Sequence, residues 1–376
     1  MIVYLKPRSP FAQVVPRSDT LFGAVAWAIR LLYGEAALTE LLVQFDEAIK
    51  VDAEPPFVLS SLFPYLEHKG NKLRFLPRPL QTPAQIVLTN PQNHQLAKKL
   101  KQVTLLSETV FAQMAQGELS DDDVLSELEK KGQARWALHG GALIAQNERD
   151  SVRLFPSLSW HGETARNSIN RLSVSTGDEG GQLFYTPIAA ARLLESLDAH
   201  TGFYCRVRLG GTASQGVRAK LEAALRFLGE KGFGGDTSVG RGHCEIEIDH
   251  AAGEIGNAGG ERLMALSLLH PSEKDRRHFT ACRQSMLARL ERRKGFIESA
   301  FVTFAQLKDV SAPSVLRVWK PTLVMLSEGA NFPRDGQRQI YGSLFRDESE
   351  REGMAFQPRI NGLGYVVPLT VKEATP

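Results

Sequence analysis

The chain has 376 residues, of which 43% are hydrophobic and 23% are charged, and this composition allows two globular cores of ordinary size. The formal net charge of +3 permits an anionic partner without requiring one. The sequence starts without the pattern of a signal peptide, and no apolar run approaches the roughly 18 residues that span a membrane. We therefore expect a cytoplasmic protein without a membrane partner. The three cysteines are far apart, which argues against a zinc site or a disulfide framework.

The first elements are predicted to be a strand and a helix. Residues 2–6 are typical of a short strand, which Pro7 ends. Ser18 and Asp19 offer N-cap oxygens to a helix whose apolar residues recur at helical spacing up to Gly34. The chain is thus expected to begin in the order strand, loop, helix.

Three further segments of the first half differ in composition. Residues 55–80 contain short apolar runs broken by prolines, which favours edge strands and turns. Residues 93–131 are polar and helical in pattern, and we interpret them as a solvated helical insertion. Residues 136–185 are rich in Gly, Ser, Asn and Arg without helical periodicity, which indicates a long hairpin or an extended loop.

In the second half of the chain, the pattern of apolar and polar residues predicts secondary structure more clearly. In residues 202–209 apolar side chains alternate with arginines and Tyr204, which predicts a strand with one apolar face. A helix is predicted over 217–228, a strand over 244–249 and another strand over 263–269. The order strand, helix, strand, strand is the beginning of a ferredoxin-like, RRM-type domain.

The predicted fold class is therefore α+β, with two ferredoxin-like (RRM-type) domains, a helical insertion and a protruding β-hairpin. We place the N-terminal domain at residues 1–199 and the C-terminal domain at residues 200–376. The first domain is expected to carry the insertion at about 93–131 and a thumb-like hairpin at about 160–186.

The strongest local signal is a glycine-rich loop at residues 231–242. Its five glycines remove Cβ atoms, permit positive φ and let backbone amides approach an anion. Hydroxyl groups lie inside the loop and a basic residue lies near each end, which suits a phosphate backbone. The alternative is a mobile surface turn. The candidate RNA-binding residues here are Lys231, Gly232, Gly234, Gly235, Thr237, Ser238, Gly240, Arg241, Gly242 and the following His243.

Known glycine-rich motifs do not fit this loop. A P-loop would need lysine at Arg241 and serine or threonine at Gly242, and it would run from strand to helix rather than from helix to strand. The RRM aromatic motif breaks at Gly235 and Asp236. The loop therefore predicts phosphate contacts without a nucleotide-binding fold.

A second candidate RNA-binding segment precedes a glycine-rich turn at residues 176–181. The basic and amide side chains there are Arg166, Asn167, Asn170 and Arg171. A projecting hairpin with such a base could wedge between nucleotides, with its arginines reaching phosphates or stacking on bases. An ordinary exposed hairpin is the alternative.

A third region, residues 273–294, is markedly basic and could face RNA, an acidic partner subunit or only solvent. Signals of catalysis are weak, because the nine histidines are scattered without an HxxxH pair or a ligand cluster. We assign no catalytic residue and expect no metal and no cofactor.

The chain resembles the Csm subunit four family, in the Cas-five group of RAMP proteins of type III-A CRISPR effector complexes. The motifs that carry this resemblance lie at residues 18–23, 166–171, 183–185, 232–242, 266–271, 293–299 and 362–368.

The resemblance implies two RRM-like domains face to face that bind the 5′ repeat-derived tag of the crRNA. The thumb-like hairpin would kink the guide, and the start of the first helix, at Ser18 and Thr20, could hold a phosphate through its amides. The implied partners are the large polymerase-like (Cas-ten type) subunit and the RAMP backbone subunit of the Csm complex. Such subunits are structural, and their partners carry out catalysis.

Three alternatives remain open. The first is a RAMP-type endoribonuclease that processes repeat RNA, with His161, His243 or Tyr204 as the reacting group. The second is the equivalent capping subunit of a type III-B complex, because Phe296 and residues 327–358 depart from the family pattern. The third is a scaffold whose basic surface contacts only protein.

Overall fold

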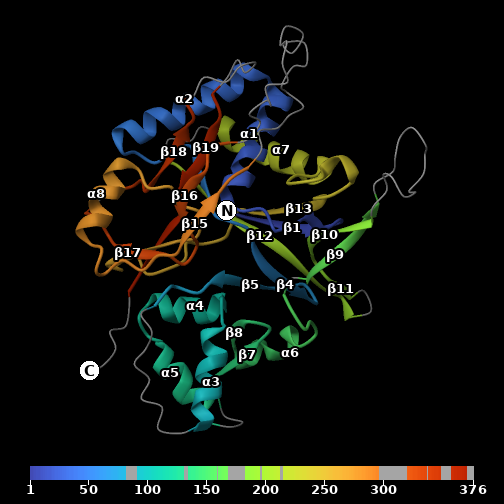
Figure 1. Cartoon of the computed structure of the whole chain (residues 1–376), viewed down its shortest axis with the longest axis vertical. Helices are drawn as coiled ribbons and strands as arrows, with labels where there is room; N and C mark the ends of the chain where they lie inside the picture. The colour runs from blue at the N-terminus through green and yellow to red at the C-terminus, as the bar shows by residue number, and fades with distance from the viewer. Residues whose placement is uncertain are drawn as a thin grey trace.

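The computed structural model describes residues 1–81, 91–130, 134–158, 160–167, 183–194, 197–211, 215–295, 320–336, 338–348 and 357–370. The fold is α+β, and a large sheet through the middle of the molecule separates helices α1, α2 and α7 from the helices of the insertion (Figure 1). Within the ranges just given, no helix combines the length and the apolar character needed to cross a membrane.

Four strands form the centre of this sheet. They are β1 (Ile2–Pro7), β4 (Phe63–His68), β12 (Ala199–Leu209) and β13 (Cys244–Asp249). The spatial order is β13-β1-β12-β4 and every neighbouring pair is antiparallel. Helix α1 (Ser18–Tyr33) follows β1, and the second helix, α7, follows β12. This chain order and strand order make one ferredoxin-like unit.

The expected boundary at residues 199 and 200 therefore does not separate two sheets. Strand β12 begins at Ala199 but lies between β1 and β4, so its residues complete the sheet that the N-terminus starts. The prediction was wrong because β12, α7 and β13 were assigned to the beginning of a second copy. Pairing between strands about 200 residues apart has no signature in local sequence.

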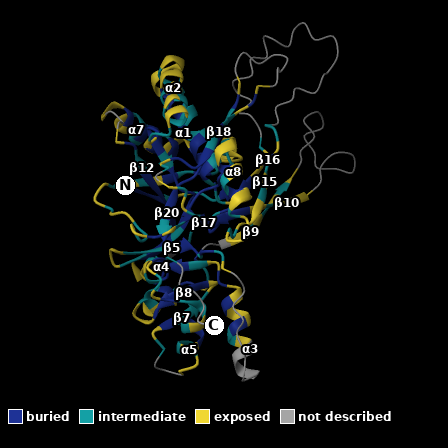
Figure 2. Ribbon diagram, turned by 90° about the vertical axis from the view of Figure 1, so that its left-hand side faces the viewer, coloured by how far each residue is buried: buried dark blue, intermediate teal, exposed yellow. Residues whose placement is uncertain are grey.

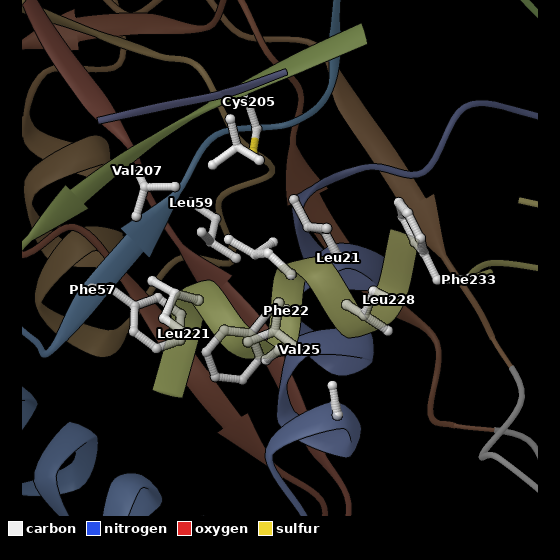
Figure 3. Packing of buried hydrophobic residues seen from close by; sticks show 14 of the residues in the cluster. Leu21, Phe22, Val25, Phe57, Leu59, Cys205, Val207, Leu221, Leu228 and Phe233 are labelled. Carbon is white, nitrogen blue, oxygen red and sulfur yellow. The ribbon is translucent and has the colours of Figure 1, made fainter. Parts of the chain in front are cut away.

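Helices α1 and α7 (Gln215–Lys231) cover one face of the central sheet. In Figure 3, Leu21 of α1 and Leu221 of α7 point toward Cys205 and Val207 of β12. All four side chains are at most 2% exposed, and burying a leucine contributes about 1.5–3 kcal/mol. The predicted helix end at Gly34 is confirmed by its φ of +88°. Helix α2 (Glu35–Val51) then packs on α1.

The sheet continues beyond β4 with strands of the insertion and of the segments that flank it. The next strands are β5 (Asn71–Pro77), β6 (Leu105–Ser107), β8 (Ala142–Ala145) and β7 (Trp136–His139), and the short strand β3 (Phe57–Leu59) pairs with the end of β12. Strand β4 is thus internal, because β12 and β5 flank it, and the expectation of edge strands was wrong for it.

The predicted helical character of the insertion is confirmed. Its helices are α3 (Pro91–Lys101), α4 (Glu108–Ala115) and α5 (Asp121–Leu128). The first part of the segment predicted as a long hairpin or an extended loop instead forms the separate β7–β8 hairpin and the short helices η1 (Gln146–Glu148) and α6 (Arg149–Val152). The burial of Leu143 and Val152 explains this, because both side chains are fully buried in hydrophobic clusters that also contain residues of β4 and β5.

The protruding hairpin is present. It consists of β9 (Trp160–Asn167) and β10 (Leu183–Ala190), which pair antiparallel, and β2 (Phe11–Ala12) pairs with the base of β10. The short β11 (Leu193–Leu194) then leads back to β12.

The described C-terminal residues form three small sheets around helix α8 (Glu273–Ala281). These sheets consist of β14 (Arg262–Ala265) with β17 (Asn331–Pro333) and β20 (Val366–Leu369), of β15 (Leu290–Arg293) with β16 (Leu323–Leu326), and of β18 (Gly342–Arg346) with β19 (Arg359–Leu363). Among these residues there is no single four-stranded sheet of the kind expected for a second ferredoxin-like domain, and the strand predicted over 263–269 already ends at Ala265.

Candidate nucleic-acid interface

The sheet face opposite α1 and α7 is not available as an RNA platform. An RRM stacks bases on aromatic side chains of its open face. Here Tyr4, Tyr65 and Tyr204 are at most 3% exposed, because they pack against the insertion and the C-terminal sheets. In Figure 2 the middle of the molecule is correspondingly dark blue. An RNA-binding surface must therefore be built outside the sheet face.

Hydrogen bonds to neighbouring segments fix the base of the glycine-rich loop. The Phe233 amide donates to the Gly242 carbonyl (3.3 Å), and the Gly242 amide donates to the Pro10 carbonyl (3.1 Å). The Phe233 side chain is 4% exposed and meets the ring of Phe11 edge-on at a centroid distance of 5.3 Å. The loop thus leaves α7 from a rigid apolar anchor.

Glycine is required at the two ends of the loop. Gly242 has a φ of +75°, and a Cβ there would lie 2.1 Å from the Phe233 carbonyl oxygen. Gly232 has a φ of +79°, and its Cβ would lie 2.6 Å from the Arg241 carbonyl oxygen. Both positions need left-handed backbone and a close approach that no side chain allows.

The outer part of the loop presents backbone donors. Gly234, Gly235 and Asp236 are exposed, and within the described ranges their amides donate to no acceptor. Asp236 adopts the left-handed conformation with a φ of +60°, just before the short 3-10 helix η3 (Thr237–Val239). Successive free amides at such a turn can bind an anion.

The structure brings the loop and the hairpin into contact. The Arg166 guanidinium lies 2.6 Å from an Asp236 carboxylate oxygen, and the Arg241 guanidinium donates to the Thr164 hydroxyl at 3.1 Å. These bonds join β9 to both halves of the loop. The two strongest sequence signals, which lie 70 residues apart, therefore form one surface.

One residue of this surface was missed by the sequence prediction. Phe184 pairs directly with Arg166 across the hairpin, so the two side chains lie on the same face. The Phe184 side chain is 45% exposed beside the loop, where it can stack on a base. Its neighbours Leu183 and Tyr185, 61% and 60% exposed, lie on the other face. Only the register distinguishes these positions, and composition does not reveal it.

The remaining predicted residues have different positions. Asn167 is exposed at the end of β9, and Lys231 is exposed at the end of α7. Thr237 is half-buried, whereas Ser238 and Gly240 are exposed. His243 is half-buried and its amide donates to the Ser9 hydroxyl (3.0 Å). Asn170 and Arg171 lie outside the described residues.

The start of α1 is already occupied within the protein. The N-cap is Arg17 rather than the expected Ser18 or Asp19. The Ser18 amide donates to the Ser61 hydroxyl (3.1 Å). Ser18 is fully buried, and the Thr20 amide donates to the carboxylate of Asp19 (2.8 Å). The expectation that Ser18 and Thr20 present free amides to a phosphate was wrong in this structure, because internal oxygens accept those hydrogen bonds.

The suspected catalytic side chains differ in their exposure. Tyr204 is fully buried, its hydroxyl donates to the Phe75 carbonyl (2.8 Å), and burial raises its pKa well above the usual value. His161 is exposed on β9. In the parts of the chain that are described, no three His, Cys, Asp or Glu side chains come together as a metal site would require.

Comparison with known proteins gives two kinds of match. No protein-family model matches the chain. Over 109 residues the chain is 32% identical to the CRISPR system Cms protein Csm4 of Thermococcus onnurineus (strain NA1). This match covers 28% of the chain and 33% of that protein, so it spans about a third of the relative's length.

Structural likeness extends further. A chain of the Csm3–Csm4 subcomplex in the type III-A CRISPR-Cas interference complex has a TM-score of 0.58 at 16% identity, with 98% of this chain and 99% of that chain covered. A chain of the Csm1–Csm4 cassette in complex with pppApA has a TM-score of 0.55 at 19% identity, with 99% of this chain and 98% of that chain covered. Csm4 is common to both structures and to the sequence match. The chain is therefore similar to Csm4 in part of its sequence and shares a fold found in Csm4-containing complexes over nearly its whole length, which confirms the resemblance predicted from its motifs.

Proposed function

We propose that this chain is a non-catalytic subunit of a type III-A (Csm) CRISPR ribonucleoprotein that binds and caps the 5′ repeat-derived tag of the crRNA. The observation that carries this proposal is the contact between the hairpin and the glycine-rich loop through Arg166–Asp236 and Arg241–Thr164. It places two guanidinium groups, a row of free amides and an exposed aromatic ring on one surface.

Each of these groups suits a different part of a nucleotide. The amides of Gly234 to Asp236 and the guanidinium of Arg241 can hold phosphate oxygens. Phe184 can stack on a base that the hairpin separates from its neighbour. In the free protein the Asp236 carboxylate pairs with the Arg166 guanidinium, so a phosphate would have to replace that carboxylate. Contacts between arginines and phosphates also make the affinity for RNA dependent on salt.

The proposed protein partners are the large polymerase-like (Cas-ten type) subunit and the RAMP backbone subunit of the Csm complex. Support comes from the structures of similar fold, in which Csm4 is found with Csm1 or with Csm3. In this proposal the chain links the large subunit to the backbone at the 5′ end of the guide. The equivalent position in a type III-B complex would use the same surface.

Purification of the tagged chain from its host or from a co-expressed operon tests the proposal. Sequencing the bound RNA should give short RNAs that share one constant 5′ segment, together with a large polymerase-like subunit and a backbone subunit. An Arg241→Ala variant should lose the RNA while it remains folded. Recovery of the chain without such RNA would refute the capping role.

The competing endoribonuclease function predicts a different result. The isolated chain would then cleave repeat RNA at one position without metal, and His161→Ala or His243→Ala would abolish the cleavage. We expect the RNA to stay intact with the unmodified chain.

A further inference from the structure

The segment between Glu273 and Lys294 remains basic after its ion pairs are taken into account. It contains eight lysines and arginines against three acidic residues. In the structure it consists of α8, the turn from Cys282 to Met286 and β15. The surface that these three parts form is called the α8–β15 surface below.

Internal partners occupy all three acidic side chains of the segment. Asp275 is fully buried, lies 2.9 Å from the Arg338 guanidinium and accepts the Gly342 amide at 2.8 Å. Glu291 pairs with Arg17, and Glu273 pairs with Arg277. None of the three carboxylates is thus left to neutralise the remaining basic side chains.

Four of the basic side chains, in contrast, point outward. Lys274, Arg283, Arg289 and Arg292 are exposed, and within the described residues none of them has an ion-pair partner. Figure 2 shows α8 largely in the colour of exposed residues, and along β15 exposed and intermediate residues alternate. Held apart from carboxylates, these four cations create a local positive field that the net charge of the chain does not reveal.

A rigid base holds the surface. Phe279 of α8 packs on Phe332 at a ring distance of 4.8 Å, in the apolar cluster that also contains Leu326 of β16. Leu326 pairs with Leu290 of β15, so the helix and the strand belong to one packed unit. Alternate residues of β15 face inward, where Arg293 pairs with Asp19, whereas Arg292 remains outside.

We propose that the α8–β15 surface binds the phosphate backbone of an RNA strand, as a site distinct from the contact between the glycine-rich loop and the hairpin. Three of the four cations named above are arginines, whose planar forks bind phosphate oxygens in pairs. Among the described residues of the segment the only large apolar side chain that is mostly exposed is Leu290, 68% exposed. Val324 of β16, which pairs with Arg292, is also exposed (46%). Two such side chains beside four cations make a smaller apolar area than the apolar centre of a protein interface.

The chemistry also predicts how the site binds. No aromatic side chain of the segment is exposed in the described structure, because Phe279 is 8% exposed. The surface therefore offers charge without stacking platforms, and its affinity should depend on salt and not on base sequence. The loop–hairpin surface, which presents Phe184, differs in this respect.

A charge-neutral variant tests this site in the full-length chain. Arg283→Gln, Arg289→Gln and Arg292→Gln are combined, and binding of a labelled single-stranded polyuridine RNA is measured by fluorescence anisotropy over a range of salt concentrations. The slope of log affinity against log salt should decrease in magnitude by about 2, because each lost phosphate contact in a single strand removes about 0.7. Affinity at low salt should fall at least about tenfold.

A matched control uses exposed cations of α3 and α6. Lys98→Gln, Lys99→Gln and Arg149→Gln remove the same charge from α3 and α6 and should leave the slope unchanged. An Arg166→Gln variant separates the two sites, since the triple variant should weaken binding further in that background.

The proposal is overturned if the triple variant keeps the salt slope of the unmodified chain. It is also overturned if the triple variant binds polyuridine normally but loses affinity for polyglutamate, because the surface would then be a protein-docking site. An equal loss of affinity in the control triple variant would overturn it as well, since net charge alone would explain the binding.

Discussion

Arg166 in the hairpin lies 2.6 Å from the carboxylate of Asp236 in the glycine-rich loop, and this ion pair ties together two segments that are separate in sequence. Arg166 is one quarter exposed and Asp236 is 40% exposed, so the pair lies at the surface where its own contribution to stability is small. Its main consequence is geometric, because it positions a guanidinium beside the free amides of the loop.

Replacement of Arg166 tests this arrangement. Arg166→Ala should weaken binding of an RNA with the repeat-derived 5′ segment by about 1–3 kcal/mol, as expected for a charge-assisted hydrogen bond to phosphate. Asp236→Asn keeps the guanidinium and removes a competing charge, so it should bind at least as tightly as the unmodified chain. Equal losses in both variants, measured by fluorescence anisotropy, would contradict direct contact of Arg166 with RNA.

Two glycines of the loop form a matched pair. Gly242→Ala should destabilise the protein by more than about 2 kcal/mol, because a left-handed backbone alone costs about 1–2 kcal/mol and the new Cβ would also meet the Phe233 carbonyl oxygen. Gly240 has a φ of +82° but open space where its Cβ would lie, so Gly240→Ala should destabilise the protein only by the cost of the left-handed backbone. Denaturant unfolding measures both. The same loss in the two variants would show that the loop relaxes around Gly242.

The covered sheet face predicts a structural role for Arg206. Its side chain is 4% exposed, donates to Glu108 at 3.0 Å and also donates to the Gly253 carbonyl. Arg206→Ala should lower the free energy of unfolding by about 1–3 kcal/mol, since Arg74 still compensates Glu108. RNA binding per folded molecule should not change. A large loss of RNA affinity without a loss of stability would place RNA on this face.

His200 should make stability depend on pH. Its pKa is lowered from the usual 6.5, first by burial and then by the nearby charge of Lys6. The folded state therefore binds fewer protons than the unfolded state. The contribution of neutral His200 to the free energy of unfolding is fully present above the unfolded pKa and is lost as the pH falls through the folded pKa. His200→Gln should flatten the decline of thermal stability on the acid side of pH 6.5. A decline of the same steepness in the variant would assign it to other groups.

Local patterns in the sequence determined several parts of this protein. The spacing of apolar residues predicted α1, α7 and β13, because each of these elements buries one face. Glycines at Gly232 and Gly242 predicted a loop with left-handed backbone, and the φ values of both residues agree. Polar composition predicted the helices of the insertion.

Tertiary structure alone decided the rest. Strand β12 joins the N-terminal sheet because pairing with β1 buries both strands, and such a long-range pairing leaves no local signal. The same burial removes Tyr204 and Arg206 from solvent, although the alternation predicted only one apolar face for this strand. The contact of Arg166 with Asp236 and the position of Phe184 beside them depend on the register of β9 and β10. Local sequence specifies register strongly only where one face of a strand is buried, and this end of the hairpin is exposed.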